Sequence, residues 1–96
     1  MSRDGDGEFD GAVRERIREL LVQLAAARSA RGTTFCPSEV ARAVYKTEAR
    51  WRALMPAVRE EADAMVKEGT LVATQRGKEV VGALNAVRGP LRLRAR

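Results

Sequence analysis

Side chains that could do chemistry in this sequence are mostly basic, and several residue types needed for catalysis are missing. The 96 residues include 18 Lys and Arg, 13 Asp and Glu, one Cys and no His. Without His, the chain can build neither a Ser-His-Asp or Cys-His catalytic arrangement nor a His-ligated metal site. A single Cys can form neither an internal disulfide nor a Cys-rich zinc site. We therefore expect a non-enzymatic binding protein with no cofactor and no metal.

The basic residues include two groups whose placement is typical of nucleic-acid binding. One group surrounds a short turn at residues 45–47, and the other flanks Gly77. Arg can pair with guanine through two hydrogen bonds, while Lys and Thr can reach backbone phosphates. A basic hairpin tip can enter the minor groove or contact the neighbouring backbone. The candidate nucleic-acid-binding residues are Arg42, Lys46, Thr47, Arg50, Arg52, Arg59, Arg76 and Lys78.

Three acidic residues, Glu60, Glu61 and Asp63, argue against this interpretation. They follow the first basic group on the same expected helix and would repel phosphate from its second half. Glu60 and Glu61 project in different directions, so they do not converge as a general acid–base pair. The acidic residues favour an alternative from another class, in which the domain binds a protein partner and no nucleic acid.

Cys36 is a further residue with chemistry of its own. We expect it at the N-cap of a helix, where the helix dipole stabilises a thiolate. A redox-sensing thiol is one hypothesis for this position. A small buried or capping residue is the other, because no second Cys and no His accompanies it.

Two helices with an apolar face are expected in the first half of the chain. Val13, Ile17 and Leu21 share one face of a helix that spans about 11–28, for which Asp10 is a good N-cap. Pro37 at a first helical position then marks a short helix over 37–44. These elements would carry Arg42 close to the turn that follows.

A third, longer helix is expected over residues 48–68, between a capping Thr47 and Gly69. Its apolar stripe runs from Trp51 to Val66 at spacings of three and four, which is typical of a core-facing side. Pro56 lies inside it and should kink or divide the helix, because proline removes one backbone hydrogen bond. The alternative is two helices, the second beginning at Pro56.

Short strands are expected at 33–35 and on both sides of a turn at 76–78. The segments 70–75 and 79–81 would form a hairpin around that turn. Near the end of the chain, Leu91 and Leu93 alternate with Arg92 and Arg94, which predicts a strand with the leucines inward and the arginines outward.

This order of elements predicts one α+β domain, a winged helix-turn-helix with three helices and a small antiparallel sheet that carries a β-hairpin wing. Strand 33–35 would close the sheet beside the hairpin. The domain would span residues 10–96. Residues 1–9 are expected to form a disordered acidic tail, because the first ten residues carry four acids and one base.

The chain also resembles a small bacterial family of unknown function that is placed in the winged-helix class. The resemblance rests on ordered blocks: CPSEVAR at 36–42, WRxLMPxVR at 51–59, TQxG at 74–77 and GPxR at 89–92. It covers residues 11–95 and implies a fold. It brings no activity, ligand or catalytic residue to this sequence.

The expected partner is double-stranded DNA, with a protein partner as the alternative. A winged helix can bind proteins through the face of its third helix or through a sheet edge. The oligomeric state is left open between monomer and homodimer, and a homodimer would present two recognition helices to paired half-sites. No apolar run approaches the length needed to span a bilayer, and no signal peptide is visible. We therefore expect a bacterial, cytoplasmic protein that does not bind membranes.

Overall fold

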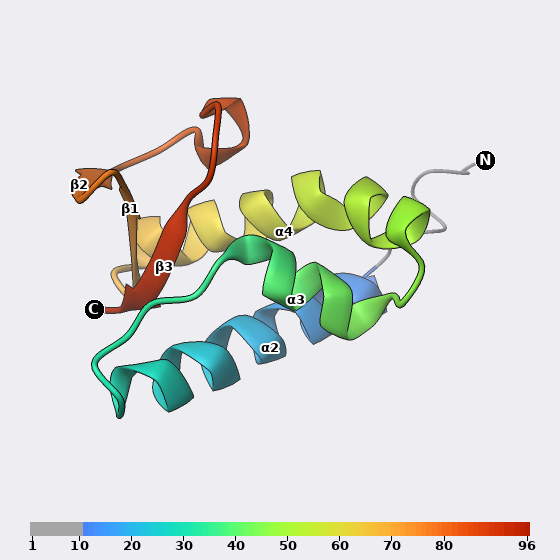
Figure 1. Ribbon diagram of the computed structural model, residues 1–96, viewed down its shortest axis with the longest axis horizontal. Helices are drawn as coiled ribbons and strands as arrows, with labels where there is room; N and C mark the ends of the chain where they lie inside the picture. Colours follow the sequence, from blue (N-terminus) through green and yellow to red (C-terminus); the bar gives the residue numbers. More distant parts are fainter. Residues whose placement is uncertain (1–10) are drawn as a thin grey trace.

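Three helices and a three-stranded antiparallel sheet form the fold in a computed structural model, which describes residues 11–96 (Figure 1). The elements follow the chain in the order α2 (Gly11–Ser29), α3 (Pro37–Val44), α4 (Glu48–Glu68), β1 (Leu71–Gln75), β2 (Lys78–Val80), the short 3-10 helix η1 (Leu84–Ala86) and β3 (Arg92–Ala95). This α+β order is consistent with a winged helix. The expected acidic tail and the Asp10 cap lie outside the described residues.

The helices begin and end almost where the sequence predicts. Cys36 occupies the N-cap of α3, and its amide donates a hydrogen bond to the Glu39 carboxylate over 3.1 Å. Thr47 occupies the N-cap of α4, but its side chain makes no capping hydrogen bond. Helix α4 runs through Pro56 as one element. The alternative of a separate helix that begins at Pro56 is therefore wrong.

The hairpin is present, with a tighter turn than expected. Gln75 faces Lys78 across the two strands, so the loop consists of Arg76 and Gly77 alone. Both loop residues have positive φ angles, 54° and 82°. Two consecutive left-handed residues are what a type I′ turn requires, and this turn matches the twist of the flanking strands. Lys78 therefore belongs to β2 and not to the turn.

The expectation for the strand at 33–35 needs a correction. Only Phe35 pairs, and it pairs with Leu93 of β3 rather than with the hairpin. The two residues exchange backbone hydrogen bonds of 2.9 and 2.7 Å. The sheet order is β2-β1-β3, so β3 separates Phe35 from the hairpin. Leu91 and Leu93 are buried and Arg92 and Arg94 are exposed, as the alternation predicts.

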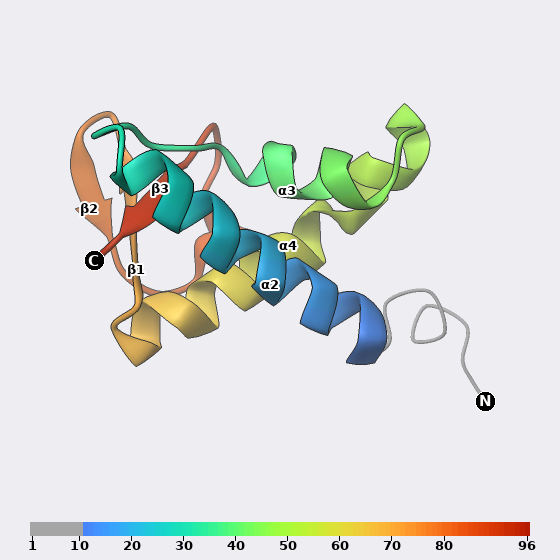
Figure 2. The ribbon, with the colours of Figure 1, turned by 90° about the horizontal axis from the view of Figure 1, so that it is seen from below.

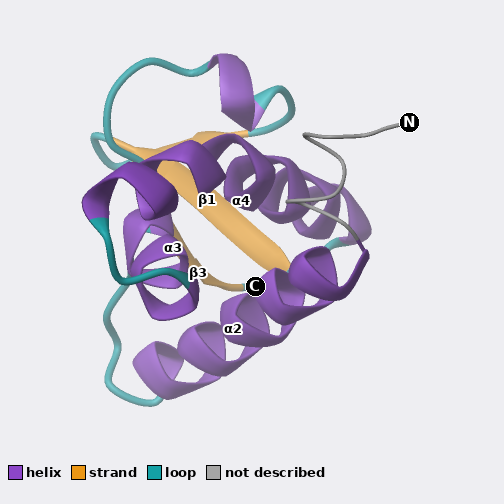
Figure 3. Cartoon of the chain, turned by 90° about the vertical axis from the view of Figure 1, so that its right-hand side faces the viewer, coloured by secondary structure: helices purple, strands orange, loops and turns teal. Residues whose placement is uncertain are grey.

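The core lies between the three helices and one face of the sheet. Figure 3 shows the strands behind and between the helices when the molecule is seen end-on. Trp51 and Met55 differ from the expectation, because they are only partly buried at the margin of the core. The largest fully buried side chains include Phe35, Ile17, Leu21, Leu54, Leu71, Leu84, Leu91 and Leu93.

The molecule is elongated, with extents of 41 × 24 × 24 Å. Figures 1 and 2 share the long axis, and both place the hairpin at one end and the turn between α3 and α4 at the other. Within residues 11–96, no helix is both long enough and apolar enough to cross a membrane.

Candidate nucleic-acid interface

Two aromatic rings at the turn between α3 and α4 carry arginine side chains on their faces. The Arg50 guanidinium carbon lies 4.0 Å from the centroid of the Tyr45 ring. The corresponding distances to the Trp51 ring are 4.6 Å for Arg42 and 5.0 Å for Arg52. A guanidinium within about 6 Å of a ring is held there by the ring's negative face. We call Arg42, Lys46, Arg50 and Arg52 the turn cluster.

Most of the turn cluster lacks an acidic partner. Within the described part of the chain, Arg42, Lys46 and Arg50 make no ion pair. The Lys46 ammonium donates only a long hydrogen bond of 3.5 Å to the Arg42 carbonyl oxygen. Arg52 differs, because its Nε donates to Glu48 over 2.6 Å. Arg42, Lys46 and Arg50 are therefore three exposed cations that are available to an anion. The Thr47 hydroxyl lies beside them and makes no capping hydrogen bond to α4.

Arg59 is placed differently from the other candidates on α4. Its guanidinium is half-buried and donates to the carbonyl oxygens of Leu84, Val87 and Gly89 over 3.1, 2.8 and 2.9 Å. These three acceptors belong to the segment between β2 and β3. The structure therefore brings Arg59 to that segment and does not bring it to the turn cluster.

The remaining candidates, Arg76 and Lys78, lie at the hairpin. Both are exposed, and within residues 11–96 neither makes an ion pair. Because the hairpin and the α3–α4 turn occupy opposite ends of the molecule (Figure 1), these two residues do not join the turn cluster. Seven of the eight candidate residues thus form two cationic groups and one internal anchor, and the eighth, Thr47, lies beside the turn cluster at the N-cap of α4.

Three acidic side chains of α4, those of Glu60, Glu61 and Glu68, are paired with arginines of α2, while Asp63 pairs with Lys67 of α4 itself at 3.3 Å. Arg14 contacts Glu60 at 3.0 Å and Glu61 at 2.9 Å. Arg18 contacts Glu61 at 3.4 Å and Glu68 at 2.8 Å. The hydrogen bond to Glu61 is the largest cause that raises the pKa of Arg14, against the opposing effect of burial. These ion pairs leave the second half of α4 less acidic than its sequence implies.

Sequence reasoning missed the two aromatic rings that hold arginines of the turn cluster. The apolar spacing predicts a core position for Trp51, and Tyr45 lies in the turn that the sequence predicts before α4. Tyr45 lies five residues before Arg50, and Arg42 lies nine residues before Trp51. Neither spacing brings two side chains together on a single helix, so the contacts arise only from the angle between α3 and α4.

Comparison with protein families places most of this chain in a known family. The family described as "Protein of unknown function (DUF3253)" matches residues 14–96. The chain belongs to the DUF3253 family. The match begins inside α2 and includes all the later elements. A comparison with curated proteins gave no match. Membership of the DUF3253 family implies no known activity, so the function must be inferred from the residues of this chain.

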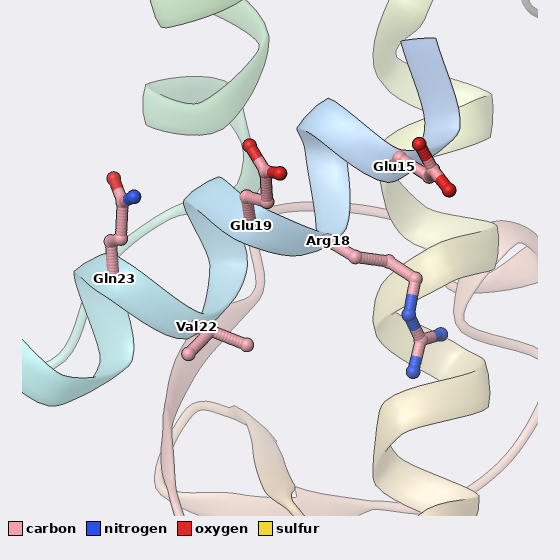
Figure 4. Close-up of a pocket in the computed structure, with 5 residues that line it drawn as sticks. All are labelled: Glu15, Arg18, Glu19, Val22 and Gln23. Atoms are coloured by element: carbon pink, nitrogen blue, oxygen red, sulfur yellow. The ribbon is translucent and has the colours of Figure 1, made fainter. Parts of the chain in front are cut away.

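The DUF3253 domain also has a shallow hollow on α2, shown in Figure 4. Its volume is about 520 Å³, and it is lined by Glu15, Arg18, Glu19, Val22 and Gln23. All five residues come from one helix, so the hollow has no opposing wall that could enclose a substrate. Within residues 11–96, no group of three potential metal ligands is present.

A second, apolar groove lies next to this hollow in the DUF3253 domain. It has a volume of about 390 Å³ and lies between α2, the end of α4 and the sheet. Val22, Met65 and Leu71 contribute to its lining. Val22 itself is 54% exposed, which is unusual for a large apolar side chain in this domain.

Cys36 is half-buried and forms no disulfide in the described part of the DUF3253 domain. Its sulfur accepts a hydrogen bond of 3.2 Å from the Ser38 hydroxyl. Its N-cap position agrees with the sequence prediction. Redox sensing by this thiol stays a prediction.

Proposed function

We propose that this domain binds double-stranded DNA, with the turn cluster at the start of α4 as the main contact and the hairpin as a wing. The observation that carries the proposal is the contrast in charge partners along α4. At its start, Arg50 has no carboxylate partner in the described chain, and neither has Lys46 just before it, although Arg52 pairs with Glu48. In its second half, Glu60, Glu61 and Glu68 are paired with Arg14 and Arg18 of α2, and Asp63 is paired with Lys67. Binding would be non-catalytic.

The turn cluster fits a phosphate-rich groove. In helix-turn-helix proteins the second helix of the motif lies in the major groove, with its N-terminal residues at base edges. Arg50 and Lys46 are exposed at that position in α4 and the preceding turn. The Tyr45 and Trp51 rings limit the motion of Arg50 and Arg42 before binding, which lowers the entropy lost when they contact DNA.

The test is binding of the full chain to a fluorescently labelled random-sequence duplex of about 25 base pairs, at about 50 and 200 mM salt. We expect micromolar affinity at low salt and a steep loss at high salt. The double variant K46Q/R50Q should lower the slope of log affinity against log salt by about 1.8, because each phosphate contact contributes about 0.9.

The matched control is R16Q/R31Q, which removes the same charge from exposed positions on α2 and the loop after it. We expect its affinity to stay close to that of the unmodified chain. An equal loss in both variants would show attraction by net charge alone and contradict a defined site. Absence of binding at low salt would overturn the proposal.

A protein-interaction module is the second candidate, and the apolar groove beside Val22 is the observation that favours it. This surface differs from the helix face and sheet edge that the sequence indicates. If this candidate holds, the unmodified chain associates with a protein partner in a sedimentation experiment, and V22K abolishes that association. The unmodified chain then gives no change in fluorescence anisotropy with labelled DNA. If DNA binding holds, V22K leaves the affinity for the duplex unchanged.

A further inference from the structure

The segment between β2 and β3 is held in place by side chains from two other elements. From α4, Arg59 donates to the carbonyl oxygens of Leu84, Val87 and Gly89. From the end of β1, Gln75 Nε2 donates to the carbonyl oxygens of Arg88 and Pro90 over 2.5 and 3.3 Å. Arg59 and Gln75 therefore bind four consecutive carbonyls, those of residues 87–90.

Gly89 permits the close approach of the Gln75 side-chain amide to the segment between β2 and β3. A Cβ atom at position 89 would lie 3.1 Å from Gln75 Nε2, and the φ angle there is +92°. A larger residue would both strain the backbone and displace the Gln75 amide. The geometry of residues 84–90 is thus fixed by hydrogen bonds that this segment, with little regular structure, cannot make for itself.

Arg88 is the residue that this anchored segment presents. Its side chain is exposed and, within residues 11–96, makes no ion pair or hydrogen bond. Its carbonyl is bound by Gln75, which directly precedes Arg76 in the hairpin turn. Glu79, the acid of the hairpin, is paired with Arg96 at 2.6 Å. Arg88 therefore adds a third free cation to the hairpin end, beside Arg76 and Lys78.

We propose that Arg88 contacts a backbone phosphate of duplex DNA next to the wing, with Gln75 and Arg59 as the residues that position it. The proposal rests on DNA binding as the function and extends the interface to a segment outside the hairpin. Arg suits this role because its planar guanidinium can bind two phosphate oxygens at once. A backbone fixed in advance reduces the entropy lost when that contact forms.

The test compares R88Q with R31Q in the same duplex-binding experiment at about 0.1 M salt. Loss of one phosphate contact should weaken binding by about eightfold and lower the salt slope by about 0.9. R31Q removes an exposed charge from the loop after α2, outside the hairpin and the segment 84–90, and should change the affinity less than twofold, as expected for a charge outside the interface. Circular dichroism melting checks that both variants fold like the unmodified chain.

Q75A tests the positioning role without a change in charge. We expect about threefold weaker binding, and faster amide hydrogen exchange confined to residues 84–90. In an R88Q background, Q75A should have no further effect on binding, because the side chain that it positions is then gone. An equal loss in both backgrounds would show that Gln75 acts through the whole fold and would overturn its role as a positioning residue.

The failures of the two proposals can be told apart. If the unmodified chain binds DNA and R88Q behaves like R31Q, the Arg88 contact is wrong while DNA binding stands. If the unmodified chain does not bind DNA at low salt, both proposals fall together.

Discussion

Arginine side chains in this domain have three kinds of partner, and the partner decides what each can do. Arg50 lies over an aromatic ring, so its charge stays available to an anion. Arg59 is bound to three backbone carbonyls and works inside the fold. Arg14 is bound to two carboxylates of α4 and offsets part of their charge. The residue type alone does not distinguish these roles.

Glu39 gives a prediction on stability at the scale of a single residue. Burial of its carboxyl opposes ionisation, but the hydrogen bonds from the Cys36 amide and the Arg28 guanidinium outweigh burial and lower its pKa. Folding therefore favours the ionised form. The stability that this group contributes is present above its unfolded pKa of about 4.3. It is lost as the pH falls through the lower, folded pKa.

We expect E39Q to reduce the free energy of unfolding by about 1 kcal/mol at pH 7, because Gln keeps the capping acceptor but loses the charge facing Arg28. At pH 3 the difference should shrink, since the unmodified chain then protonates too. Urea unfolding at both pH values measures this. E15Q, at an exposed glutamate with no ion pair among residues 11–96, is the control. If E39Q lowered the free energy of unfolding equally at both pH values, the charge of Glu39 would not be the cause of the loss.

The hairpin turn connects stability and charge at the scale of an element. Arg76 holds a left-handed conformation at φ 54°, which is costly for most residues other than glycine, asparagine and aspartate. An Asn-Gly pair is the preferred sequence for a type I′ turn. The arginine at this position is therefore suboptimal for the turn itself, which is consistent with a role for its charge.

R76N should raise the free energy of unfolding by about 0.5–1 kcal/mol and weaken DNA binding at the same time. Stability rises because asparagine relieves the backbone strain of the turn. Affinity for DNA falls because the wing loses a cation. Thermal unfolding and fluorescence anisotropy measure them separately. R31N serves as the control for loss of charge outside the hairpin. If stability and affinity both fell, the interpretation of the turn would be wrong.

At the scale of the whole molecule, the two cationic groups lie at opposite ends of a 41 Å long axis (Figure 2). One turn of B-form DNA is about 34–36 Å long and holds about 10–10.5 base pairs. A duplex shorter than one turn can contact only one group at a time. The distance between the groups thus sets a minimum length for full binding.

We therefore expect the affinity per binding site to rise steeply between duplexes of about 8 and 12 base pairs and to change little beyond that. On the longer duplexes, the effects of K46Q/R50Q and K78Q on binding free energy should add within about 0.5 kcal/mol, because the sites are far apart. Anisotropy with a length series of constant base composition measures both. Equal affinity for 8 and 16 base pairs would show that only one end binds.

The sequence by itself determined the local elements of this protein. Helices α3 and α4, the hairpin and the alternation in β3 follow from caps, glycines and periodic apolar residues, which act over a few neighbouring positions. Seven of the eight candidate residues can be selected from the sequence because they are basic, and Thr47 because it lies in the turn before α4. The sequence indicates two basic groups, but it could not predict that they lie at opposite ends of the molecule (Figure 1) or that Arg59 binds inside the fold, because both depend on how α4 and the sheet are placed.

Only the tertiary structure decided which charges are free. Arg14 meets Glu61 across 47 positions, Arg59 meets Val87 across 28, and Phe35 pairs with Leu93 across the sheet. No local pattern encodes such contacts, since they depend on the relative placement of whole elements around the core. The same placement leaves Arg50 and Arg88 unpaired among residues 11–96. The sequence contains the charges, and packing of the elements selects those that can reach a partner.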